Sequence, residues 1–182
     1  MKLLYEQSAP YFSVPDITGA TIDLESYRGK KTLICFLRYA GCPFCNLLLS
    51  SLVERYPRYH DKGLEIIAFV QSPRESVTER SMERQNPKPV FPIIADPERE
   101  IYEKYGVEVS ATKAISSLVK TPLSFMRVAN KHFPQGKIDG SLLLMPAFFL
   151  VQPDLTIYKS YYTADFSTGI PDIDILDFLL FK

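Results

Sequence analysis

Apolar positions along the chain follow two rhythms, which predict an alternation of strands and helices. Two uninterrupted apolar runs, at 32–37 and 64–70, are typical of strands buried on both faces of a largely parallel sheet. Between them, apolar side chains recur every three or four residues from Cys45 to Tyr56, which predicts a helix that Pro57 ends or kinks. This order of elements favours a right-handed crossover and an α/β fold.

The same patterns continue on both sides of this unit. Turn residues and apolar runs together predict, in chain order, a hairpin of 11–14 and 21–24, a polar helix from Ser72 to about Arg84, a strand at 90–94, a helix from Asp96 to Tyr105, strands at 147–151 and 156–161, and a closing helix at about 172–181.

Residues 109–140 interrupt the alternation. Apolar side chains in this stretch, among them Ile115, Leu118 and Phe125, fall on one face of a helical pattern, and a polar loop follows them. We therefore expect an inserted helix over 111–131. Its one-sided apolar face predicts packing on the domain, where it narrows access to a site or forms a homodimer contact.

Composition and charge narrow the functional classes. The 182 residues suit one domain, 1–182, whose core is large enough to be stable without disulfide bonds or a structural metal. The 21 basic and 21 acidic side chains cancel and no basic stripe appears, which argues against a nucleic-acid partner. The longest apolar run, 142–151, is half of a membrane span, so no membrane partner is expected. The first ten residues lack a secretory apolar core, which predicts a cytoplasmic protein.

The candidate chemistry lies in the run Gly41-Cys42-Pro43-Phe44-Cys45, which directly follows the first buried strand. Pro43 suits the first position of a helix, which puts Cys42 at the cap. A sulfur there faces unpaired backbone N–H groups and the positive end of the helix dipole, and both favour its thiolate. Cys45 falls on the same helix face, close enough to form a disulfide. We expect Cys42 to be the more exposed and the more acidic thiol.

Other polar candidates carry weaker signals. A zinc site would need ligands from Cys35, His60 and His132, whose spacing is unlike that of ligand sets, and no metal is expected. Cys35 lies within a strand and is interpreted as an inert buried thiol. Arg38 stands at the carboxyl end of that strand, where ligand sites on parallel sheets gather; a role beside the thiolate and simple surface exposure are both open. The aromatic residues of 158–166 are interpreted as packing.

Several segments together resemble the peroxiredoxin-like alkyl hydroperoxide reductase and thiol-specific antioxidant (AhpC/TSA) group of the thioredoxin superfamily. The likeness covers nearly the whole chain and rests on Ala9 to Asp16 with Gly19, on 22–24 and 27–30, on Phe36 to Cys45, on Phe91 to Glu100 with Tyr105-Gly106-Val107, and on Pro146 to Asp154. The resemblance implies a thioredoxin fold: a central mixed sheet flanked by helices, with the N-terminal hairpin and the helical insert. It also implies that Pro146 is the superfamily's cis-proline, preceded by Met145, and that both help to position substrate with Pro43, Phe44 and Arg38.

Departures from the peroxiredoxin pattern concern the mechanism. The resemblance places Cys45 at the peroxide-attacking position, Cys42 at the position of a Thr, Arg38 at that of a Pro, and Pro146 at that of an Arg. Two of these replacements restore what thioredoxins and glutaredoxins carry. The buried acidic residue of thioredoxins is replaced by Phe36, so proton transfer to or from Cys45 has no evident side-chain carrier.

These residues predict a thiol-disulfide oxidoreductase in which Cys42 attacks a disulfide and Cys45 resolves the mixed disulfide. The alternative is a thiol-dependent peroxidase, with Cys45 oxidised to a sulfenic acid and Cys42 condensing with it. A third possibility is a redox-sensing module without turnover. The expected partners are a protein disulfide or a peroxide as substrate, and thioredoxin or glutathione as electron donor. No cofactor is expected beyond the redox-active Cys42–Cys45 disulfide.

Overall fold

The computed structural model describes residues 1–83, 89–120 and 133–181. Its centre is a five-stranded mixed sheet with the strand order β5-β4-β3-β6-β7. The strands are β3 (Lys31–Leu37), β4 (Leu64–Val70), β5 (Ile93–Ala95), β6 (Ala147–Val151) and β7 (Ile157–Tyr162). The strands β3, β4 and β5 are parallel, whereas β6 pairs antiparallel with β3 and β7 pairs antiparallel with β6. The predicted mixed α/β sheet is thereby confirmed.

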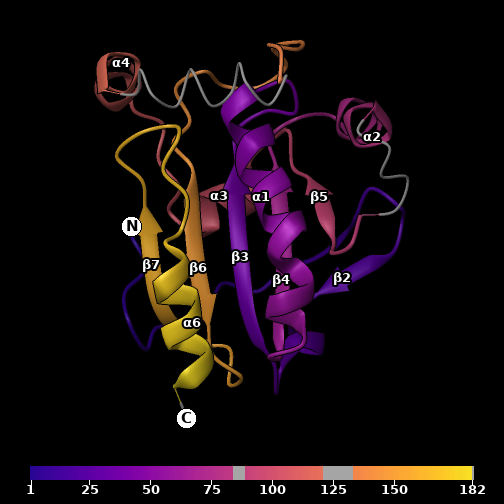
Figure 1. Ribbon diagram of the computed structural model, residues 1–182, viewed down its shortest axis with the longest axis vertical. Coiled ribbons are helices and arrows are strands. Elements are labelled where there is room, and N and C mark those ends of the chain that lie inside the picture. The colour runs from indigo at the N-terminus through magenta and orange to yellow at the C-terminus, as the bar shows by residue number, and fades with distance from the viewer. Residues whose placement is uncertain (84–88, 121–132, 182) are drawn as a thin grey trace.

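Helices cover both faces of the sheet (Figure 1). The helices α1 (Pro43–His60) and α6 (Asp172–Leu180) lie on one face, and α3 (Glu100–Lys104) lies on the other. The remaining elements are the antiparallel hairpin of β1 (Ser13–Pro15) and β2 (Thr21–Asp23), the 3-10 helix η1 (Leu24–Tyr27), α2 (Arg74–Glu83) and α4 (Ala111–Lys120). In the described ranges, no helix combines the length and apolar character that a bilayer crossing requires.

The alternation of side chains along β3 divides the core into two layers. Leu33, Cys35 and Leu37 pack with α1 and α6, whereas Ile34 and Phe36 face α3 and the N-terminal segment. Phe36 stacks on Phe69 with ring centroids 4.8 Å apart. Because both layers are apolar, the central strands lack the polar alternation of a half-exposed sheet, as the uninterrupted runs predict.

Several helix boundaries differ from the prediction, among them the start of α2 at Arg74, the end of α1 and the start of α3. The helix α1 continues through Pro57 to His60. A proline removes only one donor, and Pro57 itself still accepts a 3.0 Å hydrogen bond from the N–H of Asp61. The last turn is also held from outside, because Tyr59 is fully buried and its hydroxyl donates to Asp172 at the start of α6. The helix α3 begins later than predicted, at Glu100, although the Asp96 carboxylate caps it as expected.

The insert is confirmed as helical over Ala111–Lys120, which forms α4. The part of the predicted helix at 121–131 lies outside the described residues. From Phe133 to Gly140 the chain is not helical and runs along the end of the sheet where β3 and β4 finish. The insert therefore supplies an extended segment beside the candidate site, and the predicted homodimer contact stays a prediction.

Candidate active site

The dithiol lies where the chain leaves β3 and enters α1. Cys42 is the N-cap of α1, with the extended backbone angles φ −74° and ψ 119°, and Pro43 follows at the first helical position, as predicted. The carbonyl of Cys42 accepts the first helical hydrogen bond, 3.0 Å from the N–H of Asn46. The side chain of Cys42 forms no capping hydrogen bond, and the first N–H groups of α1 have no acceptor within the helix.

Cys42 is the acidic thiol of the pair. Its pKa is lowered to about 6, first because the Cys45 thiol donates a hydrogen bond to its sulfur. The positive charge of Arg38 and the backbone N–H groups of Cys45 and Phe44 lower it further, against the opposing effect of burial. At pH 7 a pKa of about 6 corresponds to roughly 90% thiolate, compared with roughly 3% for an ordinary cysteine.

Cys45 has the opposite character. Burial raises its pKa well above the ordinary value, and the hydrogen bond that it donates to Cys42 raises it again. The backbone N–H of Arg38 lies 3.2 Å from its sulfur. The two sulfurs are therefore distinguished before any substrate arrives, because one is held as a thiolate and the other as the thiol that stabilises it.

Arg38 lies beside the thiolate and not at the surface. It is 4% exposed, and its Nη1 is 3.5 Å from the sulfur of Cys42. Its Nη2 donates a 2.6 Å hydrogen bond to the carbonyl of Leu142, and its guanidinium lies 3.8 Å from the ring centroid of Phe166. Among the described residues Arg38 forms no ion pair with a carboxylate. The Cys42 thiolate is therefore the anionic group that interacts with its positive charge.

The expectation that Cys42 is the more exposed thiol is wrong. Cys42 is 0% exposed and Cys45 is 3% exposed. The segment 133–142 crosses the loop before α1 and contacts Gly41, the residue next to Cys42. The N–H of Gly136 donates to the carbonyl of Gly41 at 2.9 Å, and the Gln135 amide donates to the same oxygen. A Cβ at Gly41 would lie 2.3 Å from the carbonyl oxygen of Lys137, so only glycine permits this approach.

The predicted cis-proline is also corrected. The described residues contain no cis peptide bond, and the bond between Met145 and Pro146 is trans. A trans bond already lets Ala147 pair with Phe36 on one side and Tyr162 on the other, which is the register that β6 requires. The carbonyl of Pro146 accepts hydrogen bonds from the backbone and hydroxyl of Thr163, and Met145 is buried in the apolar layer that holds both site cysteines.

The remaining sequence candidates lie apart from the dithiol or outside the described residues. Cys35 is fully buried in β3, and desolvation alone raises its pKa, as expected of an inert thiol. His60 lies at the far end of α1, beside Tyr56 and Glu65. His132 is outside the described residues. Within the described ranges, no group of three His, Cys, Asp or Glu side chains is arranged to hold a metal ion.

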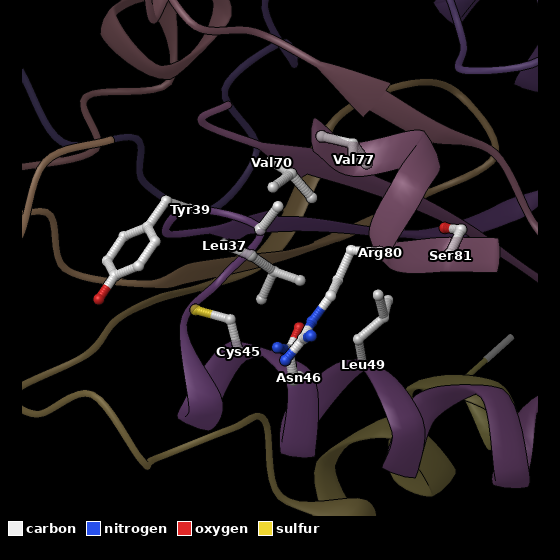
Figure 2. Close-up of a pocket in the computed structure, with 10 residues that line it drawn as sticks. Leu37, Tyr39, Cys45, Asn46, Leu49, Val70, Val77, Arg80 and Ser81 are labelled. Atoms are coloured by element: carbon white, nitrogen blue, oxygen red, sulfur yellow. The ribbon is translucent and has the colours of Figure 1, made fainter. Parts of the chain in front are cut away.

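Three further residues of the site escaped sequence reasoning. Phe166 supplies the ring under Arg38, Leu142 supplies the carbonyl that orients its guanidinium, and Asn46 borders a small pocket behind Cys45 (Figure 2). Phe166 and Leu142 follow Cys42 by a hundred residues or more and act through a ring face and a backbone oxygen, for which a sequence carries no local signal. Asn46 is a polar residue in the first turn of an otherwise apolar helix face, and that position is a signal that sequence reasoning could have used.

The arrangement of strand, dithiol helix and surrounding sheet agrees with comparisons to known proteins. The sequence model of the AhpC/TSA family matches residues 5–160. The chain belongs to the AhpC/TSA family. The sequence resemblance is thereby confirmed over most of the chain.

Individual relatives of this AhpC/TSA protein carry two kinds of name. The thiol-disulfide oxidoreductase ResA of Bacillus thuringiensis is 32% identical over 108 residues, which cover 58% of this chain and 60% of ResA. A Mycobacterium tuberculosis protein bearing a peroxiredoxin name is 26% identical over 99 residues, 54% of this chain and 60% of that protein. The crystal structure of peroxidoxin BcpB from Mycobacterium tuberculosis matches 98% of this chain and 97% of its own with a TM-score of 0.67 at 12% identity, which confirms the thioredoxin fold.

Proposed function

We propose that this AhpC/TSA protein is a thiol-disulfide oxidoreductase whose nucleophile is Cys42. The observation that carries the proposal is the division of roles between two adjacent sulfurs, one with its pKa lowered to about 6 and the other with its pKa raised. A nucleophile must be ionised to attack, and a resolving thiol must wait until the mixed disulfide has formed. The similarity to ResA supports the same reaction class.

The reaction proceeds in two displacements. The Cys42 thiolate attacks one sulfur of a substrate disulfide, a new S–S bond forms, and the other substrate sulfur leaves as a thiolate. Cys45 then loses its proton and attacks Cys42, which closes the Cys42–Cys45 disulfide and releases the second substrate thiolate. Both electrons come from the two sulfurs, so the proposal requires no metal or organic cofactor. Thioredoxin or glutathione in the cytoplasm is the proposed source of the electrons that reopen the disulfide.

Arg38 is the proposed electrostatic partner of the nucleophile. Its guanidinium is held by the Leu142 carbonyl and the Phe166 ring, which fixes its charge beside the Cys42 sulfur. Met145, Pro146, Pro43 and Phe44 stay predictions as substrate-positioning residues. Because Cys42 is 0% exposed, a protein disulfide reaches its sulfur only when part of the neighbouring chain moves, and the segment 133–142, which is hydrogen-bonded to Gly41, is the proposed moving part.

A single assay tests the proposal. The reduced protein should reduce insulin or another protein disulfide with repeated turnover when thioredoxin and its reductase are supplied, or when glutathione and its reductase are supplied. An oxidised dithiol that neither donor reduces would contradict the proposal and favour the sensing module instead.

Peroxide reduction is the second candidate, and the burial of both sulfurs favours it. A peroxide is small enough to reach a sulfur that a protein disulfide cannot reach without a movement of the chain. The family membership and the relative with a peroxiredoxin name point the same way. The resemblance assigns the attack on peroxide to Cys45, whereas the thiolate in this structure is on Cys42. Mass spectrometry after one equivalent of peroxide identifies the sulfur that is oxidised.

A further inference from the structure

Behind the dithiol lies a pocket of about 20 Å³ that has no part in the two displacements as written (Figure 2). Cys45, Asn46 and Leu49 of α1 form one wall, and Arg80 and Ser81 of α2 lie opposite. A volume of roughly 10–15 Å³ is enough to hold one water molecule when polar partners are present. The pocket is therefore the size of one water and is bordered by the resolving cysteine.

The Asn46 amide supplies a polar partner. Asn46 is 3% exposed, and its Nδ2 is buried without a hydrogen-bond partner. A buried amide donor without a partner costs roughly 1–3 kcal/mol, so such groups in native proteins generally bind protein atoms or ordered water. Since Asn46 borders the pocket, a water there satisfies its amide.

Resolution creates a need for a proton acceptor at this place. In the reduced protein the Cys45 thiol donates to the Cys42 thiolate. Once Cys42 is bonded to a substrate sulfur, that acceptor has lost its charge, while Cys45 still carries a proton that burial holds firmly. Among the described residues, the pocket is lined by neither a carboxylate nor an imidazole, and Phe36 faces the opposite layer of the core.

We propose that one water molecule, held by Asn46 Nδ2, accepts the proton of Cys45 during resolution. The water oxygen takes the Asn46 N–H on one lone pair and the Cys45 S–H on the other. The Cys45 sulfur then attacks the Cys42 sulfur, the bond between Cys42 and the substrate breaks, and the substrate sulfur leaves with the electron pair. The water passes a proton on to solvent, and the departing thiolate takes one up from solvent.

A larger pocket lies next to the first. It has a volume of about 120 Å³, its lining includes Gly136, Lys137 and Asp139, and it shares Ala40 and Arg80 with the first pocket. The shared lining places the proposed water next to a larger space that admits several waters. Asn46 is thus a positioning residue, because it holds the water and exchanges no proton itself.

The inference rests on the proposed function, and the experiment separates the two. Reduced protein is mixed with a symmetric nitrophenyl disulfide, which releases one coloured thiolate when Cys42 attacks and a second when Cys45 resolves. The variants are Asn46→Leu, which replaces the amide by two methyl groups with the same branching, and Asn46→Asp, which puts a carboxylate in the place of the amide. Leu49→Met is the matched control, because it changes the same pocket and leaves the amide intact. Urea unfolding of every variant verifies that it is folded.

The expected result is a change confined to the second phase. Asn46→Leu should leave the first phase within about twofold of the parent and slow the second by about 100-fold or more, because positioned proton-transfer groups contribute roughly 10²- to 10⁴-fold. Asn46→Asp should recover the second phase, with a rate that falls as the carboxylate is protonated. Equal slowing of both phases, no slowing, or an equal effect of Leu49→Met would overturn the inference. Absence of the first phase in the parent would instead overturn the proposed function.

Discussion

A comparison of Cys35 with Cys42 shows that burial alone does not determine the reactivity of a thiol. Cys35 lies at the centre of β3 and Cys42 lies just beyond its end, and both are 0% exposed. Burial raises the pKa of Cys35, whereas the pKa of Cys42 is lowered to about 6. The difference is the supply of hydrogen-bond donors and positive charge.

Few free hydrogen-bond donors surround Cys35 at the strand centre, because the backbone N–H groups there are bonded to neighbouring strands. Cys35 pairs with Ala68 on one side and Phe148 on the other, so its surrounding backbone groups bond to neighbouring strands. At Cys42 the chain has left the sheet and begun a helix, whose first N–H groups have no partners within the helix. The first cause of the lowered pKa is the hydrogen bond from the Cys45 thiol, and Arg38 adds a positive charge at the same place.

The largest expected effect comes from replacing each of the two site cysteines in turn by serine. Cys42→Ser should abolish disulfide reduction, because the remaining thiol of Cys45 is protonated and buried. Cys45→Ser should retain the attack and accumulate a mixed disulfide through Cys42, since only resolution is lost. Mass spectrometry after a model disulfide, and separately after stoichiometric peroxide, locates the adducts.

The peroxidase alternative predicts the reverse dependence. A sulfenic acid formed rapidly on Cys45 in the Cys42→Ser protein, with no adduct on Cys42 in the Cys45→Ser protein, would contradict the assignment of Cys42 as the nucleophile.

The second effect concerns Arg38. Arg38→Met should raise the pKa of Cys42 from about 6 to about 7 or above, because an adjacent positive charge lowers a thiol pKa by roughly one unit or more. The hydrogen bond from Cys45 remains, so the pKa should stay below that of Cys35. The pH dependence of alkylation at Cys42, followed by mass spectrometry, measures the change.

Arg38→Lys is the matched control for charge. It keeps a cation on a shorter, non-planar group and should shift the alkylation profile less than Arg38→Met does. Identical profiles for Arg38→Met and the parent protein would show that the guanidinium does not act on the thiolate.

Much of the difference in pKa between Cys35 and Cys42 could be predicted from the sequence, because residues close along the chain determine it. The apolar run of β3, Pro43 at the first helical position and the spacing of the two cysteines all lie within fifteen residues, and they set the cap geometry that lowers the pKa of Cys42. The inert character of Cys35 follows from its place in an uninterrupted apolar run.

The predictions that the structure corrects concern features that depend on residues distant in the sequence. The segment 133–142 meets the residue before Cys42 through a backbone hydrogen bond from Gly136 to the carbonyl of Gly41, and a backbone carbonyl carries no sequence signature. The sequence does not decide between a surface position and a site position for Arg38, because Leu142 and Phe166, which hold its guanidinium, are far away along the chain. The cis bond at Pro146 came from family resemblance alone, and the strand register at Ala147 is met without it.

A smaller effect is a pH dependence of stability in the reduced protein. The folded pKa of Cys42 is about 6, below the unfolded value of about 8.5. Between these values the unfolded chain binds more protons, so the thiolate's contribution to stability is full above about 8.5 and is lost as the pH falls through 6. Above about 8.5, Cys45 acts oppositely, because it ionises first in the unfolded chain.

Urea midpoints of the reduced parent and of Cys42→Ser should therefore move apart as the pH rises from 5.5 to about 8. Comparison of the two proteins cancels the contribution of titrating groups that do not interact with Cys42. A constant separation over that range would show that Cys42 is not ionised preferentially in the folded state.

The smallest expected effect belongs to Cys35. Cys35→Ala removes one buried heavy atom from the layer beneath α1 and should lower the free energy of unfolding by about 1 kcal/mol, the cost of a small cavity. The rates of both thiolate-release phases should be unchanged. Burial keeps the Cys35 thiol protonated, and the proposed reaction does not use Cys35. Urea unfolding and the two-phase release assay measure the two quantities on the same sample. A loss of either phase in Cys35→Ala would mean that the strand centre takes part in the chemistry, and the contrast between the middle and the end of β3 would no longer hold.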